Sequence, residues 1–377
     1  MKKRLGIYVI YDEQNVICNA DLYLAQEIRS VTSRLIVCVN STEKVDAQKL
    51  SKYTDEIIVR DNSGYDAGAV KEVLCGYLNE GELQDYDELV ISNNSFFGPF
   101  IPMREIFRTM DLRKCDYWGL SGYAGDESLF WRGAGSYFWV FKRAIIQERF
   151  LENFIQKYVN EKNNDFMEAC GIYECKLNYE LMKRFQLDMY ADVGALNIFD
   201  AGDLAMMKYS LPIIKRKFFI EKRTDFTRII NALRFIAGTG FNSSYVEEKL
   251  YRLYGIAVTN DGGSWVEPDI KESEYEIPKT DITYRQIEEF LDVNHSVYIY
   301  GAGYFATFIW AIFGEKYNAI KGFVTTNQAE KEKFHGYDIV TIDRLASTDS
   351  VLVALNAEHT NEVRQSLQGR NCLFLHK

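Results

Sequence analysis

Two short polar segments carry residue types that bind charged or hydroxylated ligands. The first, RDNSGYDAGA over residues 60–69, places a carboxylate at Asp66 among glycines that permit tight turns. The second, over residues 86–99, ends an apolar run in the small polar side chains Asn93, Asn94 and Ser95. Such groups suit a ribose, a diphosphate or a hydrated cation. Taken singly, the first segment is equally a turn in which Asp66 caps a helix, and the second a strand-end turn.

The distribution of histidine limits the chemistry of the N-terminal part. The histidines lie close to the C-terminus and show no metal-like spacing (His295, His335, His359 and His376), so residues 1–294 contain none. A histidine base, a Ser-His-Asp triad and a histidine metal ligand are therefore excluded there. Carboxylates must supply any general base or metal ligand in that region.

Composition indicates a folded protein of the reducing cytosol. The 377 residues are 47% hydrophobic and carry a net charge of −10, which argues against a general nucleic-acid-coating role. Seven scattered cysteines without a CxxC pair disfavour a disulfide framework or a structural zinc site. Asp12 and Glu13 end the first apolar stretch too early for an export signal, and no stretch is long enough to span a membrane.

The polar segments follow predicted strands in an alternating strand and helix pattern. Helical spacing predicts helices over 21–30 and 67–78, and apolar stretches predict strands over residues 5–11, 34–40, 56–60 and 88–92. Alternation of this kind predicts an α/β fold with a mostly parallel sheet. Ligands bind beyond the carboxyl ends of such strands, so both segments are expected at one edge. Further along, we expect a strand over 137–142 and helices over 143–160 and 173–185.

A smaller C-terminal domain is predicted over residues 295–377. It is separated from a domain over 1–255 by a polar linker with a short helix, over 256–294. Gly301-Ala302-Gly303 follows a strand and opens a helix, the context of a phosphate loop. The next strand, however, ends at 324–327 without an acid to hold a ribose of NAD. We therefore favour a Rossmann-like accessory domain over a nicotinamide-dependent enzyme.

A basic window covers residues 213–236. It holds seven Lys or Arg, Lys215, Arg216 and Lys217 among them, against two acids, and its apolar residues recur at helical spacing. The window suits a helix on an anionic membrane surface, where lipid-linked acceptors reside. A helix packed on the core with a solvated basic edge explains the same pattern.

Together the motifs resemble those of the rhamnan synthesis protein F family, glycosyltransferases of bacterial cell-wall and surface polysaccharides. The order is strand, NxGYDxGA, helix, YDxL, strand, NxSxxGP, and then DYWGL over 116–120. Further matches are SYFWVFK, YE and LPIIKRK, at 136–142, 173–174 and 211–217. The resemblance extends over about residues 4–255.

The resemblance implies an A-type glycosyltransferase fold, Rossmann-like with a mostly parallel sheet, that takes a nucleotide-diphosphate sugar as donor. The donor site would comprise Tyr8, Asp12, Asn62, Gly64, Tyr65, Asp66, Asn93, Asn94, Ser95 and Arg132. The family usually has N-D-S where this chain has Asn93-Asn94-Ser95, so an amide replaces a carboxylate of the metal-binding motif. We therefore expect weak or absent dependence on Mn²⁺ or Mg²⁺. Arg132 stands where the family often has other polar residues. We expect it either to offset diphosphate charge or to be a surface arginine.

A carboxylate is the expected base for an inverting transfer, because no histidine precedes His295. Glu174, in the YE motif at the start of a helix, is the first candidate. Asp126 and Glu127, in a glycine-rich segment, are the alternatives.

The sequence thus predicts a cytoplasmic glycosyltransferase, peripheral at the inner face of the cell membrane. It would transfer a sugar such as rhamnose to a glycan or lipid-linked glycan in cell-wall, capsule or surface polysaccharide synthesis. The alternative is a catalytically reduced subunit that binds a sugar nucleotide or glycan beside an active transferase. Asn94 motivates that alternative.

Overall fold

A computed structural model describes residues 2–41, 43, 45–123, 132–277, 279–327 and 333–376. The chain divides into two compact units. Unit 1 comprises Met1–Ala124, Gly133–Asn164 and Leu181–Ile277, and unit 2 comprises Gly125–Arg132, Asp165–Glu180 and Pro278–Lys377. The linker expected over 256–294 is shared between the two units, and the predicted domain boundaries stay a prediction.

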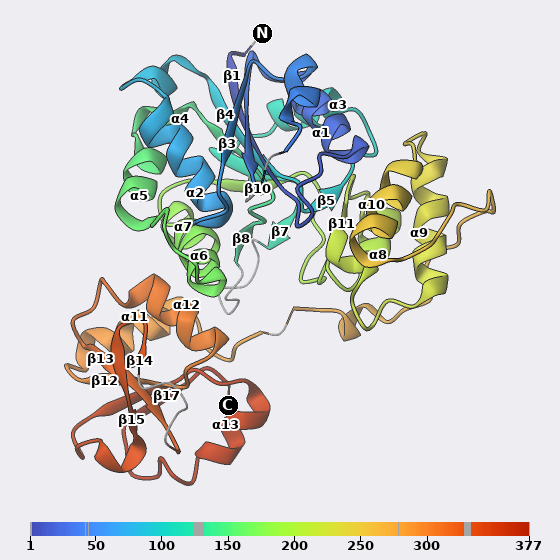
Figure 1. Cartoon of the computed structure of the whole chain (residues 1–377). Helices are drawn as coiled ribbons and strands as arrows, with labels where there is room; N and C mark the ends of the chain where they lie inside the picture. Colours follow the sequence, from blue (N-terminus) through green and yellow to red (C-terminus); the bar gives the residue numbers. More distant parts are fainter. Residues whose placement is uncertain are drawn as a thin grey trace. The chain divides into compact units, whose positions relative to one another are not determined.

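The described residues of unit 1 form a seven-stranded sheet in the order β10-β6-β9-β4-β1-β2-β3 (Figure 1). All neighbouring strands are parallel except around β9, which is antiparallel to both β4 and β6. This arrangement confirms the predicted α/β class with a mostly parallel sheet. The strands are β1 (Arg4–Tyr11), β2 (Arg34–Asn40), β3 (Glu56–Arg60), β4 (Glu88–Asn93), β6 (Tyr117–Gly119), β9 (Phe138–Lys142) and β10 (Leu187–Met189).

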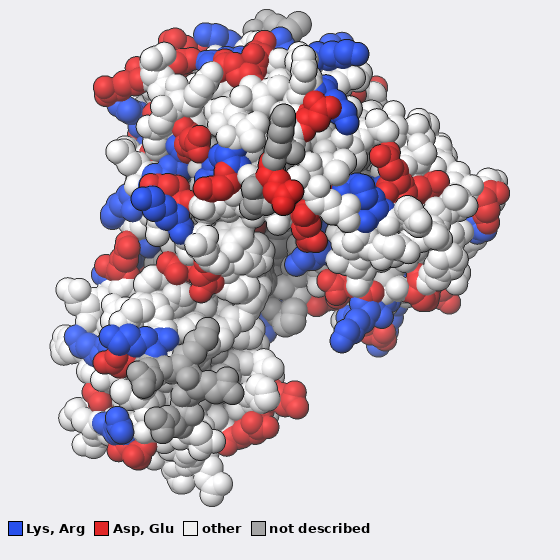
Figure 2. Space-filling view, in the orientation of Figure 1, with Lys and Arg blue, Asp and Glu red and all other residues white. Residues whose placement is uncertain are grey.

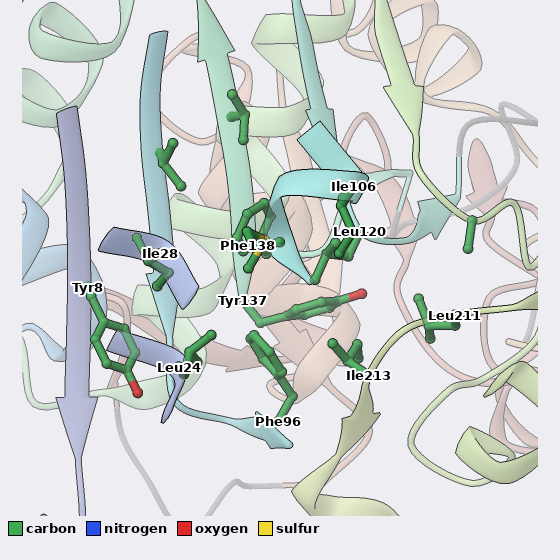
Figure 3. Close-up of a cluster of buried hydrophobic side chains, with 14 of the residues drawn as sticks. Tyr8, Leu24, Ile28, Phe96, Ile106, Leu120, Tyr137, Phe138, Leu211 and Ile213 are labelled. Carbon is green, nitrogen blue, oxygen red and sulfur yellow. The ribbon is translucent and has the colours of Figure 1, made fainter. Parts of the chain in front are cut away.

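Helices cover both faces of this sheet. On one face, α1 (Asn19–Arg29) and α3 (Met103–Asp111) pack onto a core that includes alternate residues of β1, Tyr8 and Ile10. Figure 3 shows Tyr8 beside Leu24 and Ile28 of α1 in this core. The other face carries α2 (Tyr65–Lys71), α4 (Arg143–Gln147) and α5 (Phe150–Tyr158) (Figure 1). The strand period of two thus decides which side chains each helix layer contacts.

Two predicted helices are interrupted. The helix expected over 67–78 is α2 followed by a π-helical stretch, η2 (Glu72–Tyr77). The helix expected over 143–160 divides into α4 and α5 because Arg149 between them adopts a left-handed φ of 52°.

A helical layer follows β10 in unit 1. The two-residue strands β5 (Phe96–Phe97) and β11 (Ile214–Lys215) pair with each other. Beside them lie α8 (Gly202–Tyr209), α9 (Phe226–Gly238) and α10 (Ser244–Tyr254), which share an apolar cluster that includes Phe97, Phe218 and Leu233. Shorter elements of this unit are η1 (Ala47–Lys52), η3 (Glu82–Asp85), β7 (Gly122–Tyr123), β8 (Gly133–Ala134), η5 (Arg216–Phe219) and η6 (Glu272–Glu274).

Unit 2 has its own sheet, which within the described residues has six strands in the order β14-β15-β13-β12-β16-β17. Every pairing is parallel except that of β14 with β15, which confirms the smaller Rossmann-like unit. The strands are β12 (Val297–Tyr300), β13 (Ile320–Thr325), β14 (Lys333–Phe334), β15 (Tyr337–Thr341), β16 (Ser350–Val353) and β17 (Cys372–Phe374).

The helices of unit 2 include a segment from the middle of the sequence. Cys175 and Tyr179 belong to the same apolar core as Phe308 and Phe313. The helical elements are α6 (Phe166–Cys170), η4 (Gly171–Lys176), α11 (Tyr284–Val293), α12 (Tyr304–Phe313), η7 (Ile342–Arg344) and α13 (Ala357–Val363), and α7 (Leu177–Met182) continues η4. Across the described part of the chain, no helix is both long and apolar enough to cross a membrane.

Candidate functional site

The loop between β3 and α2 has a backbone shape that only glycine fits at one position. Gly64 has a φ of 70°, and a Cβ atom there would lie 2.9 Å from the backbone of Glu161. The Gly64 amide donates to the Asn163 carbonyl, and the Tyr65 hydroxyl donates to the Asn164 carbonyl at 2.8 Å. This anchoring fixes the first turn of α2 and with it the position of Asp66.

Asp66 does not cap its helix. Gly64 occupies the capping position, and no side chain caps α2. Instead, one carboxylate oxygen of Asp66 accepts a hydrogen bond of 2.7 Å from the Asn93 amide at the end of β4. The two polar segments singled out in the sequence therefore meet at the carboxyl edge of the sheet.

The polar contacts continue from Asn93 to a lysine far along the chain. The side-chain oxygen of Asn93 accepts from the Ser95 hydroxyl at 2.6 Å and from the Ser95 backbone amide at 3.0 Å. The Lys215 ammonium in turn donates to Ser95 Oγ at 2.6 Å and lies 4.1 Å from the centre of the Tyr137 ring. Asp66, Asn93, Ser95 and Lys215 thus form one chain of hydrogen bonds, which we call the edge chain.

Burial and charge act in opposite directions on Asp66. Burial raises the pKa of this carboxyl above its usual value, against the hydrogen bond from Asn93 and the positive charges of Lys215, Arg216 and Arg60. A partly buried carboxylate beside cations suits ligand hydroxyl groups and an adjacent anionic group.

Asn94 points away from the edge chain into the interior. Its side-chain oxygen accepts from the Tyr11 amide at 3.2 Å, and its nitrogen donates to the Tyr11 carbonyl at 3.1 Å and to Asp21 Oδ1 at 2.8 Å. Asp21 is also paired with the Lys249 ammonium at 2.7 Å, and both side chains are almost fully buried. Although burial opposes ionisation, the Lys249 charge and the surrounding donors lower the pKa of Asp21 to about 2.

This arrangement does not fit a metal ligand at position 94. Every hydrogen-bonding atom of the Asn94 amide already has a protein partner, and the nearest carboxylate, that of Asp21, is neutralised by Lys249. In the described residues, no group of three or more His, Cys, Asp or Glu side chains is arranged to hold a metal ion.

Two further predicted donor residues, at β1, are buried. Asp12 is ion-paired with Arg252 at 2.5 Å and accepts from the backbone amides of Gln14 and Val16. Burial disfavours ionisation of Asp12, but the hydrogen bond from Arg252 keeps the pKa of Asp12 below its usual value. The Tyr8 hydroxyl is fully buried and has no hydrogen-bond partner among the described residues. Figure 3 shows it at the side of the ring nearer the carboxyl end of β1.

Asn62 forms hydrogen bonds with residues on both sides of the loop. Its side-chain oxygen accepts from the Asn40 amide at 3.0 Å, and its carbonyl accepts from the Tyr65 amide. Asn62 therefore joins the ends of β2 and β3.

The basic window is partly buried and partly exposed: Lys215 and Arg228 are buried, whereas Lys217, Lys222 and Arg223 are exposed. Lys215 is 5% exposed, and Arg228 is buried in a bidentate pair with Asp203. Arg234 is paired with Asp261, while Ile229, Leu233 and Ile236 face the core. The alternative of a core-packed helix therefore describes α9. On the face shown in Figure 2, basic and acidic side chains are interspersed.

The remaining predicted residues lie elsewhere or outside the described chain. Glu174 is on η4 in unit 2, and Arg132 also belongs to unit 2, where its charge acts on the Tyr284 hydroxyl. Asp126 and Glu127 lie outside the described residues.

A cavity of about 480 Å³ lies at the opposite, amino edge of the β1–β4 pair. It is lined by charges that already pair with one another, Lys2 with Glu88 and Arg143 with Asp87. We place the site at the carboxyl edge instead, since ligands of parallel sheets bind there.

Sequence reasoning missed the residues that reach this edge from far along the chain. Lys249 and Arg252 on α10 pair with Asp21 and Asp12 near β1, and Lys215 reaches Ser95. The signal for Lys215 was present in the LPIIKRK match, but its basic character suggested a surface.

The sheet defines a Rossmann-like α/β protein, and polar groups from the ends of β3 and β4 meet at its carboxyl edge, where ligands of parallel sheets usually bind. The model of the family described as rhamnan synthesis protein F, RgpF, matches residues 35–248, more than half of the chain. The chain belongs to this family. Membership supports a glycosyltransferase-like role in polysaccharide synthesis.

Two solved structures show distant likeness to this chain. The glycosyltransferase GlyE of Streptococcus pneumoniae TIGR4 is 9% identical, with 99% of this chain and 91% of that chain covered and a TM-score of 0.34. For 4-diphosphocytidyl-2C-methyl-D-erythritol synthase the identity is 11%, the coverage 43% and 83%, and the TM-score 0.29. No curated protein matches the sequence.

Proposed function

We propose that this protein is a glycosyltransferase that moves a sugar such as rhamnose from a nucleotide-diphosphate sugar to a glycan acceptor. The observation that carries the proposal is the edge chain, which joins Asp66, Asn93, Ser95 and Lys215 beyond the carboxyl ends of the parallel strands. It positions the Asp66 carboxylate for ligand hydroxyls at an edge where the positive charges of Lys215 and Arg216 act, which suits adjacent phosphate oxygens. Membership of the rhamnan synthesis protein F family supports the same reaction class.

In the proposed reaction, the acceptor hydroxyl oxygen forms a bond to the anomeric carbon of the donor sugar. The bond from that carbon to the diphosphate breaks, and its electron pair leaves with the nucleoside diphosphate. The acceptor proton passes to a carboxylate base. Glu174 stays the first candidate for this base, and Asp126 or Glu127 the alternatives.

We further propose weak or absent dependence on Mn²⁺ or Mg²⁺. The support is the inward orientation of Asn94, whose amide is committed to Tyr11 and Asp21. A hard cation prefers carboxylate oxygens, which this position lacks.

The acceptor and its location belong to the same proposal. A glycan that grows on a lipid at the inner face of the cell membrane would bring the enzyme to that surface, in cell-wall, capsule or surface polysaccharide synthesis. Of the three residues first considered for membrane contact, Lys217 is exposed and Lys215 is buried. We assign the donor site to residues 1–255 and an accessory role to residues 295–377.

A panel of nucleotide sugars tests the donor. Each compound is added to the full chain in excess EDTA or with Mn²⁺, and the melting temperature is measured, since a ligand of the folded state raises it. We expect at least one nucleotide-diphosphate sugar to stabilise the protein equally in both conditions, and the matching nucleoside monophosphate to do so less. Absence of any stabilisation would contradict the proposal.

A catalytically reduced binding subunit remains the second candidate, because the motif resemblance implies a carboxylate at the position of Asn94. Donor hydrolysis and transfer separate the two functions. Binding with product release by the purified chain supports the enzyme. Binding without turnover, even when acceptor glycans are added, supports the subunit.

A further inference from the structure

We propose that the Arg216 guanidinium binds the diphosphate of the donor and supplies positive charge that a metal ion would otherwise bring. The inference rests on the proposed function and names the residue that recognises the leaving group. It reassigns a residue that the sequence placed on a membrane surface.

The backbone holds Arg216 against the second polar segment. β11 pairs with β5 in the register Lys215↔Phe96, and the Arg216 amide donates to the Ser95 carbonyl at 3.1 Å. Two motifs more than a hundred residues apart, NxSxxGP and LPIIKRK, are therefore joined by main-chain hydrogen bonds. Arg216 follows directly after the lysine that ends the edge chain.

A close packing contact fixes this pairing. Gly98 has a φ of 123°, and a Cβ atom there would lie 2.7 Å from the Pro212 carbonyl oxygen. That same carbonyl accepts from the Phe100 amide at 2.7 Å. Figure 3 shows Ile213 and Phe96 side by side under the Tyr137 ring, so residues next to this pairing belong to the packed core.

Other cations near this edge are committed to protein partners. Arg60 bonds to Glu72, Asn40 and the Ser63 carbonyl, Lys249 bonds to Asp21, and Arg252 bonds to Asp12. The Arg216 side chain, by contrast, is partly exposed and makes no hydrogen bond or ion pair with any described residue. It is therefore available to a ligand.

The charge of Arg216 reaches groups from several elements around the edge. It opposes the effect of burial on the pKa of Asp66, and likewise on those of Tyr8 and Tyr254. Asp66 follows β3, Tyr8 is on β1 and Tyr254 ends α10. The positive charge of Arg216 therefore influences groups on several elements near the carboxyl edge of the sheet.

The chemistry of the leaving group fits this position. When the bond between the sugar and the diphosphate breaks, a full negative charge develops on the phosphate oxygen. A guanidinium presents a planar set of donors that matches two phosphate oxygens, and it remains charged at any working pH. Such a group stabilises the departing diphosphate without a change in its own protonation.

The test compares Arg216→Gln and Arg216→Lys with Lys217→Gln, a neighbouring exposed cation that serves as the matched control. Affinities for inorganic pyrophosphate and for the nucleotide sugar that stabilises the wild type most are measured by calorimetry in excess EDTA. Circular dichroism melting verifies the fold of each variant. We expect Arg216→Gln to weaken both ligands at least tenfold, the loss typical of a charged hydrogen bond. Arg216→Lys should lose less, and Lys217→Gln less than twofold.

The outcomes separate this inference from the proposed function. Wild-type affinity of Arg216→Gln for the nucleotide sugar, or an equal loss in Lys217→Gln, overturns the role of Arg216 and leaves the donor assignment intact. Pyrophosphate binding that needs Arg216, without any nucleotide-sugar binding by the wild type, supports the anion site and overturns the proposed function. Failure of the wild type to bind either ligand overturns both.

Discussion

Asn94→Asp restores the carboxylate that the family usually carries, and we expect it to destabilise this protein. The new carboxylate would replace the Asn94 nitrogen that now lies 2.8 Å from Asp21 Oδ1. Two like charges about 4 Å apart repel by about 4 kcal/mol at an effective dielectric constant of about 20. The Lys249 ammonium, 2.7 Å from the same oxygen, offsets part of that repulsion.

Protonation sets the upper limit of this cost. The introduced carboxyl has an unfolded pKa of about 3.9, and each pH unit above it costs about 1.4 kcal/mol if the group stays neutral when folded. The limit is therefore about 4 kcal/mol at pH ~7 and about 1.5 kcal/mol at pH ~5. The pKa of the introduced carboxyl is higher in the folded than in the unfolded state. The stability of the variant relative to the wild type is therefore greatest at low pH and falls as the pH rises.

Urea unfolding followed by tryptophan fluorescence measures this effect, since Trp118 and Trp139 are buried in the sheet of unit 1. Asn153→Asp, the same chemical change at an exposed position on α5, is the matched control and should shift stability by less than about 0.5 kcal/mol. An Asn94→Asp deficit that is absent, or that is the same at both pH values, would refute the inward orientation of Asn94. Acquired Mn²⁺ dependence of donor binding would refute it as well.

Three further substitutions test the site. Asp66→Ala should weaken donor binding at least tenfold with little change in melting temperature, because a hydrogen bond to a charged group contributes about 1.5–3 kcal/mol. Unchanged donor affinity, measured by calorimetry, would argue against a ligand role for Asp66. Gly64→Ala should destabilise the protein more than Gly194→Ala. Both positions have positive φ, but only a Cβ at Gly64 would approach the Glu161 backbone, at 2.9 Å. An equal fall in melting temperature for the two variants would contradict that contact. Glu174→Gln should lower turnover by about 10²–10⁴ with donor affinity unchanged, as expected for a general base; retention of more than about a tenth of the wild-type rate would point to another base.

The apolar pattern along the chain determined the framework. The predicted limits of β2 and β3 coincide with the observed strands, and those of β1 and β4 differ by a single residue at one end. Buried parallel strands are short continuous apolar runs bounded by polar residues, so this information is local. Because both residues follow strands predicted to be parallel, the sequence also predicted Asp66 and Asn93 at one edge of the sheet.

The tertiary structure alone decided which polar groups are free and which are committed. Asn94 looked like a ligand position, yet its amide joins Tyr11 to Asp21, and a lysine 228 residues away neutralises that aspartate. Lys215 looked like a surface cation, yet it is buried against Ser95. A charged side chain becomes stable inside a protein only through its partners, and those partners come from distant elements that the fold brings together. Residue type and local spacing carry no record of that pairing.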